Sequence, residues 1–374
     1  MLQPIKVLVV DDSALMRRVI TRLLEVQADI KVIDTASDGE EAIKKITKLR
    51  PDVVTMDVEM PGMNGVTVVS RLMRECPVPV IMLSAHTTEG ARVTMEALAA
   101  GAVDFVPKPQ KAGEAEKLAA ELSRKIRVAR RASLKRCPAA PVEQRRPTPA
   151  PAPARPRPAG APLPGPAAGE KPAPIPTVRP TPGQTELLVI GSSTGGPAAL
   201  QALLPALPGD LSCGVVVVQH IPVGFSGPMA EHLNRKCRLE VKHAEHGDRV
   251  LPGQVLVAPA GYDLTFRKYA GRLSVALDKG SKPVPPGGFR PSVDVVMNSA
   301  AEVAGSRAMG VLLTGMGRDG ARGMLAIKQR GGYTIAQDES TCVVYGMPRA
   351  AAELGAAAKI LPLQKIAGEI VRVV

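Results

Sequence analysis

The sequence predicts two α/β domains, each built on a doubly wound, mostly parallel sheet, joined by a proline-rich linker. The chain has 374 residues, which is enough for two hydrophobic cores. Hydrophobic residues make up 45% of the chain and aromatic residues 2%, a composition typical of aliphatic parallel strands covered by helices. Residues 138–182 include 16 prolines, which fix φ and donate no backbone hydrogen bond. We therefore expect domains over residues 1–136 and 187–374, with a linker over residues 137–186.

Short apolar runs alternate with longer amphipathic stretches in the first half of the chain. The expected strands are Ile5–Val10, Lys31–Ala36, Val53–Met56, Val80–Ser84 and Val103–Val106. The expected helices are Ser13–Val26, Glu40–Lys48, Gly65–Glu75, Glu89–Ala100 and a basic one from Gly113 to about Arg131. Five strand–helix units in this order predict a parallel, doubly wound sheet.

The same alternation begins again after the linker. The expected strands are Leu187–Gly191, Cys213–His220, Gln254–Ala258, Met309–Thr314 and Tyr333–Ala336. Helices are expected at Pro197–Leu207 and Arg322–Gln329. This pattern predicts a second α/β domain with a mostly parallel sheet.

The composition argues against several classes of protein. The net charge of +13 is spread as +4, +3 and +6 over residues 1–136, 137–186 and 187–374, so no concentrated basic domain for nucleic acid stands out. No apolar run reaches the roughly 18 residues of a membrane span, and the N-terminus MLQPIKVLVVDD is unlike a signal peptide. The five cysteines form no C-x-x-C pair, as expected for free thiols in a reducing compartment. We therefore expect a cytoplasmic protein that does not insert into the membrane.

Acidic residues follow the ends of two predicted strands in the first domain. Asp11 and Asp12 follow the first strand, Asp57 follows the third, Ser84 ends the fourth and Lys108 follows the fifth. Ligands bind beyond the carboxyl ends of the strands in open parallel sheets, and three carboxylates there favour a hard cation such as Mg²⁺. Asp57 would then attack a phosphoryl donor, while Lys108 and Ser84 would contact the phosphoryl group. The alternative is that these acids only solvate loops.

This pattern resembles the receiver domain of two-component response regulators. The matching segments are VLVVDDSALMR, VVTMDVEMPGMNG, VIMLSA and GAVDFVPKP, within about residues 4–130. The resemblance implies a flavodoxin-like (βα)5 fold with Asp57 as phosphoacceptor and Asp11 and Asp12 as further metal ligands. It also implies that Ser84, Phe105 and Lys108 are the switch residues.

A serine stands on a glycine-rich turn at the start of the second domain. Gly191, Ser193 and Gly195 fit the pattern G-x-S-x-G between a predicted strand and a helix that begins near Pro197. Such a turn exposes the central serine next to a helix N-terminus, which stabilises negative charge. A turn of this kind can instead cradle phosphate, although Ser193 occupies the position where a G-x-G-x-x-G motif needs its second glycine.

A nucleophilic serine needs a base and an acid that orients it. Of the five histidines, His86, His220, His232, His243 and His246, only His220 follows a buried strand on the same sheet edge as Ser193. The candidate acids are Asp278, Asp294, Asp319 and Asp338. Asp319 lies in the loop Gly315-Met316-Gly317-Arg318-Asp319-Gly320, which follows a predicted strand. The order Ser, His, Asp differs from that of the α/β-hydrolases, so geometry has to define the triad.

The second half resembles the catalytic domain of the CheB family, the protein-glutamate methylesterases of bacterial chemotaxis. The matching segments are VIGSSTGGPAAL, VVVVQHIP, GDRVLPGQVLVAPAG, FRPSVDVVMNSAA, LLTGMGRDGARGM and QDESTCVVYGMPRAA. The resemblance implies that Ser193 is the nucleophile, His220 the base and Asp319 the orienting acid, with the Met316 N–H as oxyanion donor. Asp263 stands where such proteins often have histidine, and the sequence suggests no role for it.

The resemblance also implies function and partners. The expected activity is phosphorylation-regulated demethylation of glutamyl γ-methyl esters, and deamidation of glutamines, on methyl-accepting chemoreceptors. The chemotaxis histidine kinase CheA would be the phosphodonor, and recruitment to membrane receptor arrays would bring the chain to its substrate. Mg²⁺ is expected in the receiver, and no cofactor is expected for the hydrolysis. Two alternatives are a receiver-controlled hydrolase of another ester or amide and a DNA-binding response regulator.

Overall fold

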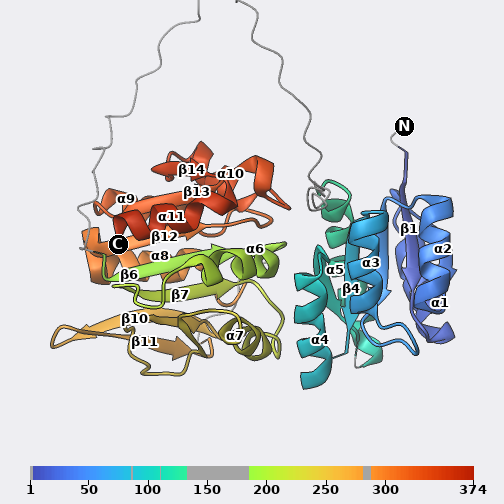
Figure 1. Cartoon of the computed structure of the whole chain (residues 1–374), viewed down its shortest axis with the longest axis horizontal. Helices are drawn as coiled ribbons and strands as arrows, with labels where there is room; N and C mark the ends of the chain where they lie inside the picture. The colour runs from blue at the N-terminus through green and yellow to red at the C-terminus, as the bar shows by residue number, and fades with distance from the viewer. Residues whose placement is uncertain (1–2, 86, 110, 133–184, 281–287) are drawn as a thin grey trace, which may run out of the picture.

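The structure is a computed structural model that describes residues 3–85, 87–109, 111–132, 185–280 and 288–374. Two α/β domains lie side by side, and the helices α4, α6 and α7 lie where they meet (Figure 1). The expected linker falls almost entirely outside the described residues, so its boundaries remain predictions. No helix in the described ranges is long and apolar enough to cross a membrane.

The first domain, which resembles a receiver, contains a five-stranded parallel sheet in the order β2-β1-β3-β4-β5. Its strands are β1 Ile5–Val10, β2 Ile30–Ala36, β3 Val53–Asp57, β4 Val80–Ser84 and β5 Asp104–Pro107. Its helices are α1 Ala14–Glu25, α2 Gly39–Leu49, α3 Gly65–Glu75, α4 Thr88–Ala99 and α5 Ala115–Ala129, the last preceded by the 3₁₀ turn η1 Ala112–Glu114. The strands and helices expected from the sequence are all present, and their ends differ by only one or two residues.

Successive strand residues point to opposite faces of this sheet, and both faces are buried. Val7 and Val9 pack with α1 and α5 on one face, whereas Leu8 and Val10 pack with α2, α3 and α4 on the other. This is why the strands appear in the sequence as continuous apolar runs rather than as alternating ones.

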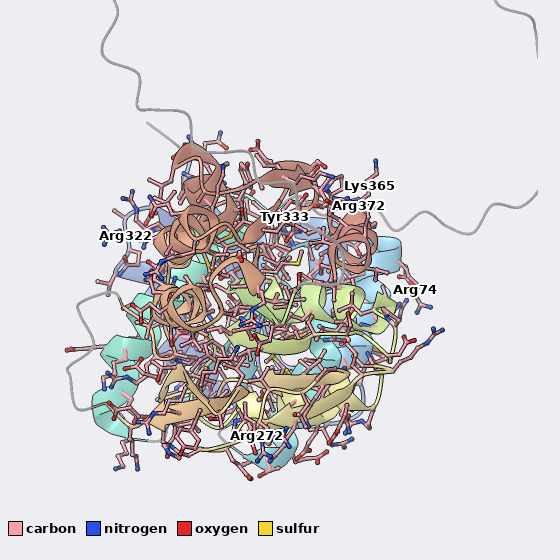
Figure 2. All side chains as sticks on the ribbon, turned by 90° about the vertical axis from the view of Figure 1, so that its left-hand side faces the viewer. Arg74, Arg272, Arg322, Tyr333, Lys365 and Arg372 are labelled. Atoms are coloured by element: carbon pink, nitrogen blue, oxygen red, sulfur yellow. The ribbon has the colours of Figure 1, made fainter. Side chains whose placement is uncertain are left out.

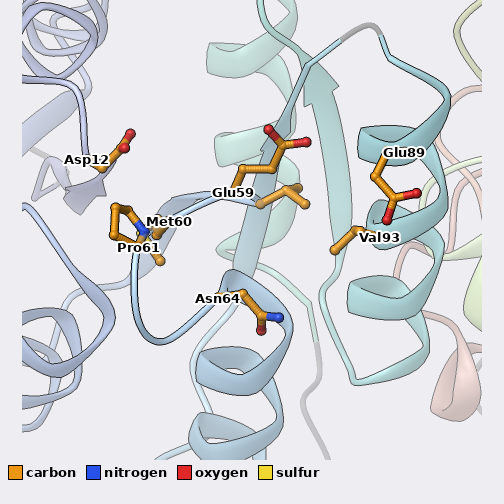
Figure 3. A pocket seen from close by; sticks show the side chains of 8 residues that line it. Asp12, Glu59, Met60, Pro61, Asn64, Glu89 and Val93 are labelled. Carbon is orange, nitrogen blue, oxygen red and sulfur yellow. The ribbon is translucent and has the colours of Figure 1, made fainter.

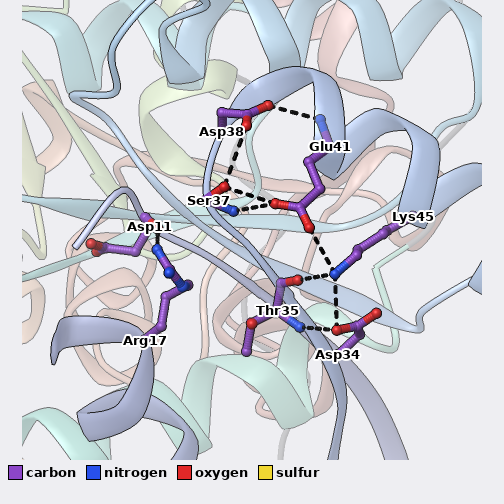
Figure 4. A network of polar contacts seen from close by, with 8 residues as sticks. All are labelled: Asp11, Arg17, Asp34, Thr35, Ser37, Asp38, Glu41 and Lys45. Atoms are coloured by element: carbon purple, nitrogen blue, oxygen red, sulfur yellow. Dashed lines mark hydrogen bonds and ion pairs between the residues drawn. The ribbon is translucent and has the colours of Figure 1, made fainter. Parts of the chain in front are cut away.

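A polar network fixes the edge of the sheet between β2 and α2 (Figure 4). Lys45 Nζ lies 3.0 Å from Asp34 Oδ1 and 2.9 Å from Glu41 Oε1, and the Ser37 N–H donates to Glu41 Oε2 at 2.7 Å. The Ser37 N–H and Lys45 lower the pKa of Glu41 to about 2. In the same view Arg17 donates to the Asp11 carbonyl oxygen at 2.7 Å, which ties α1 to the end of β1.

The second domain contains a seven-stranded sheet in the order β14-β13-β12-β6-β7-β9-β8, and every neighbouring pair is parallel. The strands are β6 Leu187–Ser192, β7 Gly214–Gln219, β8 Glu240–His243, β9 Gln254–Val257, β12 Ala308–Leu312, β13 Tyr333–Gln337 and β14 Lys359–Leu361. The helices are α6 Gly196–Leu203, α7 Ser226–Asn234, α8 Val293–Ala304, α9 Ala321–Gln329, α10 Met347–Glu353 and α11 Leu363–Val373. The 3₁₀ turns are η2 Leu204–Ala206, η3 Gly305–Arg307 and η4 Glu339–Thr341.

The two faces of the second sheet are covered by different elements. Leu188 and Ile190 of β6 face a core that includes α6, α7 and α11. Leu187 and Val189 face a core that includes α8, α9, α10 and an antiparallel hairpin of β10 Asp263–Tyr269 and β11 Arg272–Asp278. The doubly wound, parallel fold expected from the sequence is thus confirmed. The sequence did not predict the hairpin, the short edge strands β8 and β14, or the helices α8, α10 and α11.

The receiver and the second domain share a continuous hydrophobic core cluster. In it Phe105 of β5 packs against Phe225, which immediately precedes α7, with ring centroids 4.5 Å apart. The basic side chains labelled in Figure 2 (Arg74, Arg272, Arg322, Lys365 and Arg372) lie on different edges of that view, in keeping with a net charge spread along the chain.

Candidate active site

The turn after β6 holds Ser193 between a strand end and a helix start. Ser193 is buried, so the exposure expected for this serine is wrong: Gly315 approaches so closely that a Cβ there would lie 2.8 Å from Ser193 Cβ. The Ser193 N–H donates to the Thr314 carbonyl oxygen at 3.0 Å, which ties the turn to the segment that follows β12. Gly195 has φ +78°, a left-handed conformation that glycine adopts without strain, and it caps the N-terminus of α6. The G-x-S-x-G pattern therefore corresponds to a strand–turn–helix, as the sequence predicted.

The register of β6 and β7 brings His220 beside Ser193. Ser192 pairs with Gln219 in the parallel ladder, so the next residue of each strand is Ser193 and His220. The His220 N–H donates to the Ser192 carbonyl oxygen at 3.0 Å, which continues the ladder to the serine turn. Backbone pairing, rather than a flexible loop, thus sets the serine next to the histidine.

Gln219 anchors the backbone of this pair, and the sequence did not identify it. Its Nε2 donates to the carbonyl oxygens of Ser193 and His220, both at 2.9 Å, and its Oε1 accepts from Ser192 Oγ at 2.6 Å. Gln219 is 2% exposed, so these polar atoms depend on one another for hydrogen bonds. The signal was a polar residue at the end of the otherwise apolar run Val215–Val218.

Asp319 is the acid that reaches His220. Asp319 Oδ2 lies 2.8 Å from His220 Nε2, and the same carboxylate accepts from Ser292 Oγ and from the N–H groups of Val293 and Asp294. Burial opposes ionisation of Asp319, but the bond to His220 and the helix N–H groups outweigh it and hold the pKa of Asp319 below its ordinary value. The carboxylate is therefore charged at neutral pH.

This contact leaves His220 Nδ1 as the nitrogen that can accept a proton. Nδ1 is buried and has no hydrogen-bond partner among the described residues, so no bond joins it to Ser193 Oγ in this structure. The hydrogen bond between a nucleophile and its base often forms only when substrate is bound. The catalytic roles of Ser193, His220 and Asp319 remain predictions.

Phe289 covers the imidazole of His220. The two rings are stacked, with centroids 4.1 Å apart and an interplanar angle of 13°. Arg290, the next residue, pairs through Nε with Asp263 Oδ2 at 3.0 Å. Asp263 thus belongs to an ion pair that anchors the segment carrying Phe289, a role that the sequence did not suggest.

The expected oxyanion donor lies close to the serine turn. A Cβ added to Gly315 would lie 2.8 Å from Ser193 Cβ, so the glycine permits a close backbone approach. Met316 follows Gly315 directly, which brings its N–H to the same sheet edge. The role of that N–H in binding an oxyanion remains a prediction.

The other described histidines have partners elsewhere. His232 Nε2 lies 3.1 Å from Gln201 Oε1, and burial lowers the pKa of His232 to about 4. His243 Nε2 lies 3.0 Å from Ser226 Oγ, and His246 Nδ1 lies 3.3 Å from the Leu277 carbonyl oxygen. His86 lies outside the described residues.

The receiver acids converge as the sequence predicted. Asp11, Asp12 and Asp57 each place a carboxylate oxygen within 4.8 Å of the others, an arrangement of hard oxygen ligands consistent with a Mg²⁺ site. Lys108 Nζ lies 2.6 Å from Asp57 Oδ2 and 2.9 Å from Asp11 Oδ2. Burial raises the pKa of Asp57 to about 6, although Lys108 partly offsets this effect.

A cavity opens beside these acids on the surface of the receiver (Figure 3). It measures about 440 Å³ and is lined by Asp12, Val58, Glu59, Met60, Pro61, Asn64, Glu89 and Val93. Because Asp12 and Val58 neighbour Asp11 and Asp57 in the chain, the cavity gives access to the acidic cluster from solvent.

The expected switch residues connect this cluster to α4 and to the second domain. Ser84 Oγ donates to the Gly90 carbonyl oxygen at 3.2 Å and accepts from Thr94 Oγ1 at 2.7 Å, so it is held against α4. Phe105 lies on the neighbouring strand β5, where it pairs with Met82, and it packs on Phe225 of the second domain.

Polar contacts also join the receiver to the serine turn. Thr194, the residue after Ser193, donates to Asp104 Oδ2 of β5 at 2.7 Å. Arg124 of α5 donates to Met316 Sδ at 3.0 Å. The receiver therefore contacts both sides of the candidate active site.

These two domains define a response regulator whose output is a parallel α/β domain with a serine, a histidine and an aspartate at one sheet edge. The sequence profile of the family described as "CheB methylesterase" matches residues 188–370, and that of "Response regulator receiver domain" matches residues 7–120. The chain belongs to the CheB family of protein-glutamate methylesterases/protein-glutamine glutaminases.

Similar proteins cover the chain almost completely. It is 46% identical over 370 residues to the protein-glutamate methylesterase/protein-glutamine glutaminase 1 of Carboxydothermus hydrogenoformans, with 98% of each chain covered. It is 45% identical over 377 residues to the corresponding protein of Symbiobacterium thermophilum, covering 100% of this chain and 98% of the relative. The crystal structure of the Thermotoga maritima CheB methylesterase catalytic domain is 42% identical, covers 51% of this chain and 99% of that one, and has a TM-score of 0.49.

Proposed function

We propose that this chain hydrolyses glutamyl γ-methyl esters, and deamidates glutamines, on chemoreceptors, and that phosphorylation of its receiver controls the reaction. The observation that carries the proposal is the strand register that sets Ser193 beside His220, together with the 2.8 Å contact from His220 Nε2 to Asp319 Oδ2. The family assignment makes a methyl ester the expected substrate rather than another ester, and it disfavours a DNA-binding output.

Acylation begins at Ser193. Its Oγ attacks the γ-carbonyl carbon of the substrate, and its proton passes to His220 Nδ1, because Nε2 already faces Asp319. The charged Asp319 stabilises the resulting imidazolium, and the Met316 N–H would donate to the oxyanion. The ester C–O bond then breaks, and the methoxide leaves as methanol with the proton from His220.

Deacylation repeats these steps with water. His220 Nδ1 takes a proton from the water as its oxygen attacks the acyl carbon. The bond to Ser193 Oγ breaks, and Ser193 recovers its proton from His220. Glutamate is released. With glutamine as substrate the first leaving group is ammonia, and the remaining steps are the same.

Phosphorylation at Asp57 supplies the control. A carboxylate oxygen of Asp57 attacks the phosphorus of the donor, the bond from phosphorus to the donor atom breaks, and an acyl phosphate results. Asp11, Asp12 and Asp57 would hold Mg²⁺, which neutralises phosphoryl charge when bound. Lys108 is placed to pair with the new charge, and we propose the histidine kinase CheA as the donor.

The contacts between the domains suggest how phosphorylation reaches the active site. Ser84 has to leave the Gly90 carbonyl and Thr94 to reach a phosphoryl group, and this would loosen α4, which packs against α6 and α7. Phe105 and Asp104 would shift with it and release Phe225 and Thr194. In the unphosphorylated state the receiver therefore restrains the serine turn and restricts access of a receptor helix.

Methanol release from methyl-labelled receptor membranes, measured with and without a small-molecule phosphodonor, tests the proposal. Removal of the nucleophile in Ser193→Ala is expected to reduce turnover by about 10⁴-fold or more. The exposed Ser212→Ala, which precedes the opposite end of β7, is expected to keep full turnover. Full activity in Ser193→Ala would refute the assignment of the nucleophile.

A further inference from the structure

Two helices next to the active site, α8 and α9, cap each other: an aspartate near the start of each accepts hydrogen bonds from the first N–H groups of the other. Asp319 immediately precedes Gly320, the cap residue of α9, yet its carboxylate accepts from the first N–H groups of α8, at Val293 and Asp294. Asp294 belongs to the first turn of α8, yet its Oδ1 accepts from the Gly320 N–H at 2.9 Å and the Gly323 N–H at 2.8 Å, at the start of α9. Each acid thus satisfies N–H groups that the other helix leaves without partners.

Glycines let the two helix starts approach closely enough for this exchange. A Cβ on Gly323 would lie 2.5 Å from Met297 Cβ and 3.1 Å from the Asp294 carbonyl oxygen. A Cβ on Gly320, which has φ +93°, would lie 2.7 Å from Val293 Cγ1. Close packing of α9 against α8 therefore explains why glycine occupies positions 320 and 323.

The exchanged contacts orient Asp319 in two ways, through its carboxylate and through the backbone of the next residue. The α8 N–H groups hold its carboxylate, and Asp294 holds the backbone of Gly320, the residue that follows it. Without an acceptor at position 294, the buried N–H groups of Gly320 and Gly323 would have to find other partners, and the loop would move. His220 would then lose a carboxylate placed 2.8 Å from its Nε2.

We propose that Asp294 is a positioning residue for the esterase reaction, which acts by holding the loop that aims Asp319 at His220. This inference rests on the proposed function, because it assigns Asp294 a part in the same site. What matters is the place of one acceptor oxygen, since both N–H groups donate to Oδ1. Asp294 contacts neither substrate nor the reacting atoms in this scheme.

The test compares Asp294→Asn, Asp294→Glu and Asp294→Ala in the full chain, activated with a small-molecule phosphodonor. Asp294→Asn keeps an acceptor oxygen at the same distance from the backbone, and Asp294→Glu keeps the charge but moves the oxygen. Asp294→Ala removes both the charge and the acceptor. A misplacement of about 1 Å can reduce turnover by about 10²-fold. We therefore expect kcat to fall by that order in Asp294→Ala, by less in Asp294→Glu and least in Asp294→Asn, with KM little changed. The exposed Glu302→Gln, on the same helix, serves as the charge control.

A second readout follows the His220–Asp319 contact directly. The low-field proton resonance of the imidazole N–H bonded to Asp319 should persist in Asp294→Asn and be lost or shifted in Asp294→Ala. If kcat of Asp294→Glu equals or exceeds that of Asp294→Asn, the charge matters and the acceptor position does not, and the inference fails. If Asp294→Ala folds and keeps the wild-type kcat, with only its melting temperature lowered, Asp294 stabilises the helix start and does not position Asp319.

The design separates this inference from the proposed function. If Asp294→Ala does not fold, the comparison of kcat between Asp294→Asn and Asp294→Glu still tests the inference. Ser193→Ala is measured in the same assay. Activity in Ser193→Ala would overturn the proposed function, whereas an inactive Ser193→Ala beside a fully active Asp294→Ala would overturn only the role of Asp294.

Discussion

The two sheet edges of this protein use an aspartate in opposite ways. Asp57 in the receiver and Asp319 in the second domain both lie at or beyond the carboxyl end of a parallel strand, and each faces a basic partner, Lys108 or His220. Burial raises the pKa of Asp57 to about 6, whereas the pKa of Asp319 lies below its ordinary value despite its burial.

The surroundings of the two carboxylates explain the difference. Asp57 shares its site with the negative charge of Asp11 and accepts one backbone bond, from Glu59 at 3.3 Å. Asp319 receives helix N–H groups, a hydroxyl and the imidazole of His220. Asp57, which reacts with phosphorus, therefore has few hydrogen-bond donors around it and can bind a cation. Asp319, which stays charged and fixed in place, is surrounded by donors.

Replacing aspartate by asparagine at each edge should change turnover most in one case and leave the basal turnover intact in the other. Asp319→Asn should lower turnover by about 10³- to 10⁴-fold with or without phosphodonor, because an amide neither stabilises the imidazolium nor selects the His220 tautomer. Asp57→Asn should keep the unphosphorylated activity and lose only the response to phosphodonor. Methanol release from labelled receptors measures both. Loss of basal turnover in Asp57→Asn would break the proposed division of roles.

The pH at which Asp57 titrates tests whether its carboxyl is held above the ordinary pKa of an aspartate. Carbon-13 NMR of the aspartate carboxyls, with Asp57→Asn to identify the signal, should show a midpoint near pH 6 in metal-free buffer. Because a protonated carboxyl cannot attack phosphorus, phosphorylation with Mg²⁺ bound should slow by about tenfold per pH unit below the midpoint measured in the presence of Mg²⁺. Mg²⁺ should lower the midpoint, and Lys108→Ala, which removes the compensating cation, should raise it. A midpoint at the ordinary value of about 4 would contradict this account.

A smaller change in basal activity is expected from the contact between the receiver helix α5 and Met316. Arg124→Ala removes the receiver bond to Met316 Sδ without changing the phosphorylation site. A single hydrogen bond contributes about 0.5–1.5 kcal/mol, so basal activity should rise by about 2- to 10-fold while phosphorylated activity stays unchanged. Lys117→Ala, at an exposed position on the same helix, is the matched control. Unchanged or lower basal activity in Arg124→Ala would argue against restraint by this contact.

Much of this molecule is legible in the sequence because parallel strands carry their own signal. The apolar runs mark both buried faces of each sheet, and the residue after each run marks the edge where ligands bind. Asp11, Asp57 and Lys108, and likewise His220 after Val215–Val218, were found in this way. The choice of Asp319 over Asp294 was not decided by spacing, since both acids lie at helix starts that meet only in the folded chain.

The two doubly wound domains, the acidic cluster and the serine turn could be predicted from the sequence, because each depends on local apolar periodicity and on which residue ends a strand. Which side chains meet became visible in the folded chain alone: Gln219 bonds to the Ser193 carbonyl oxygen, Phe289 stacks on His220, and α8 and α9 cap each other. Folding also brought β5 and α5 of the receiver to the serine turn. These contacts join residues far apart in the chain or on opposite sides of a turn, and packing sets their distances, which no local pattern records.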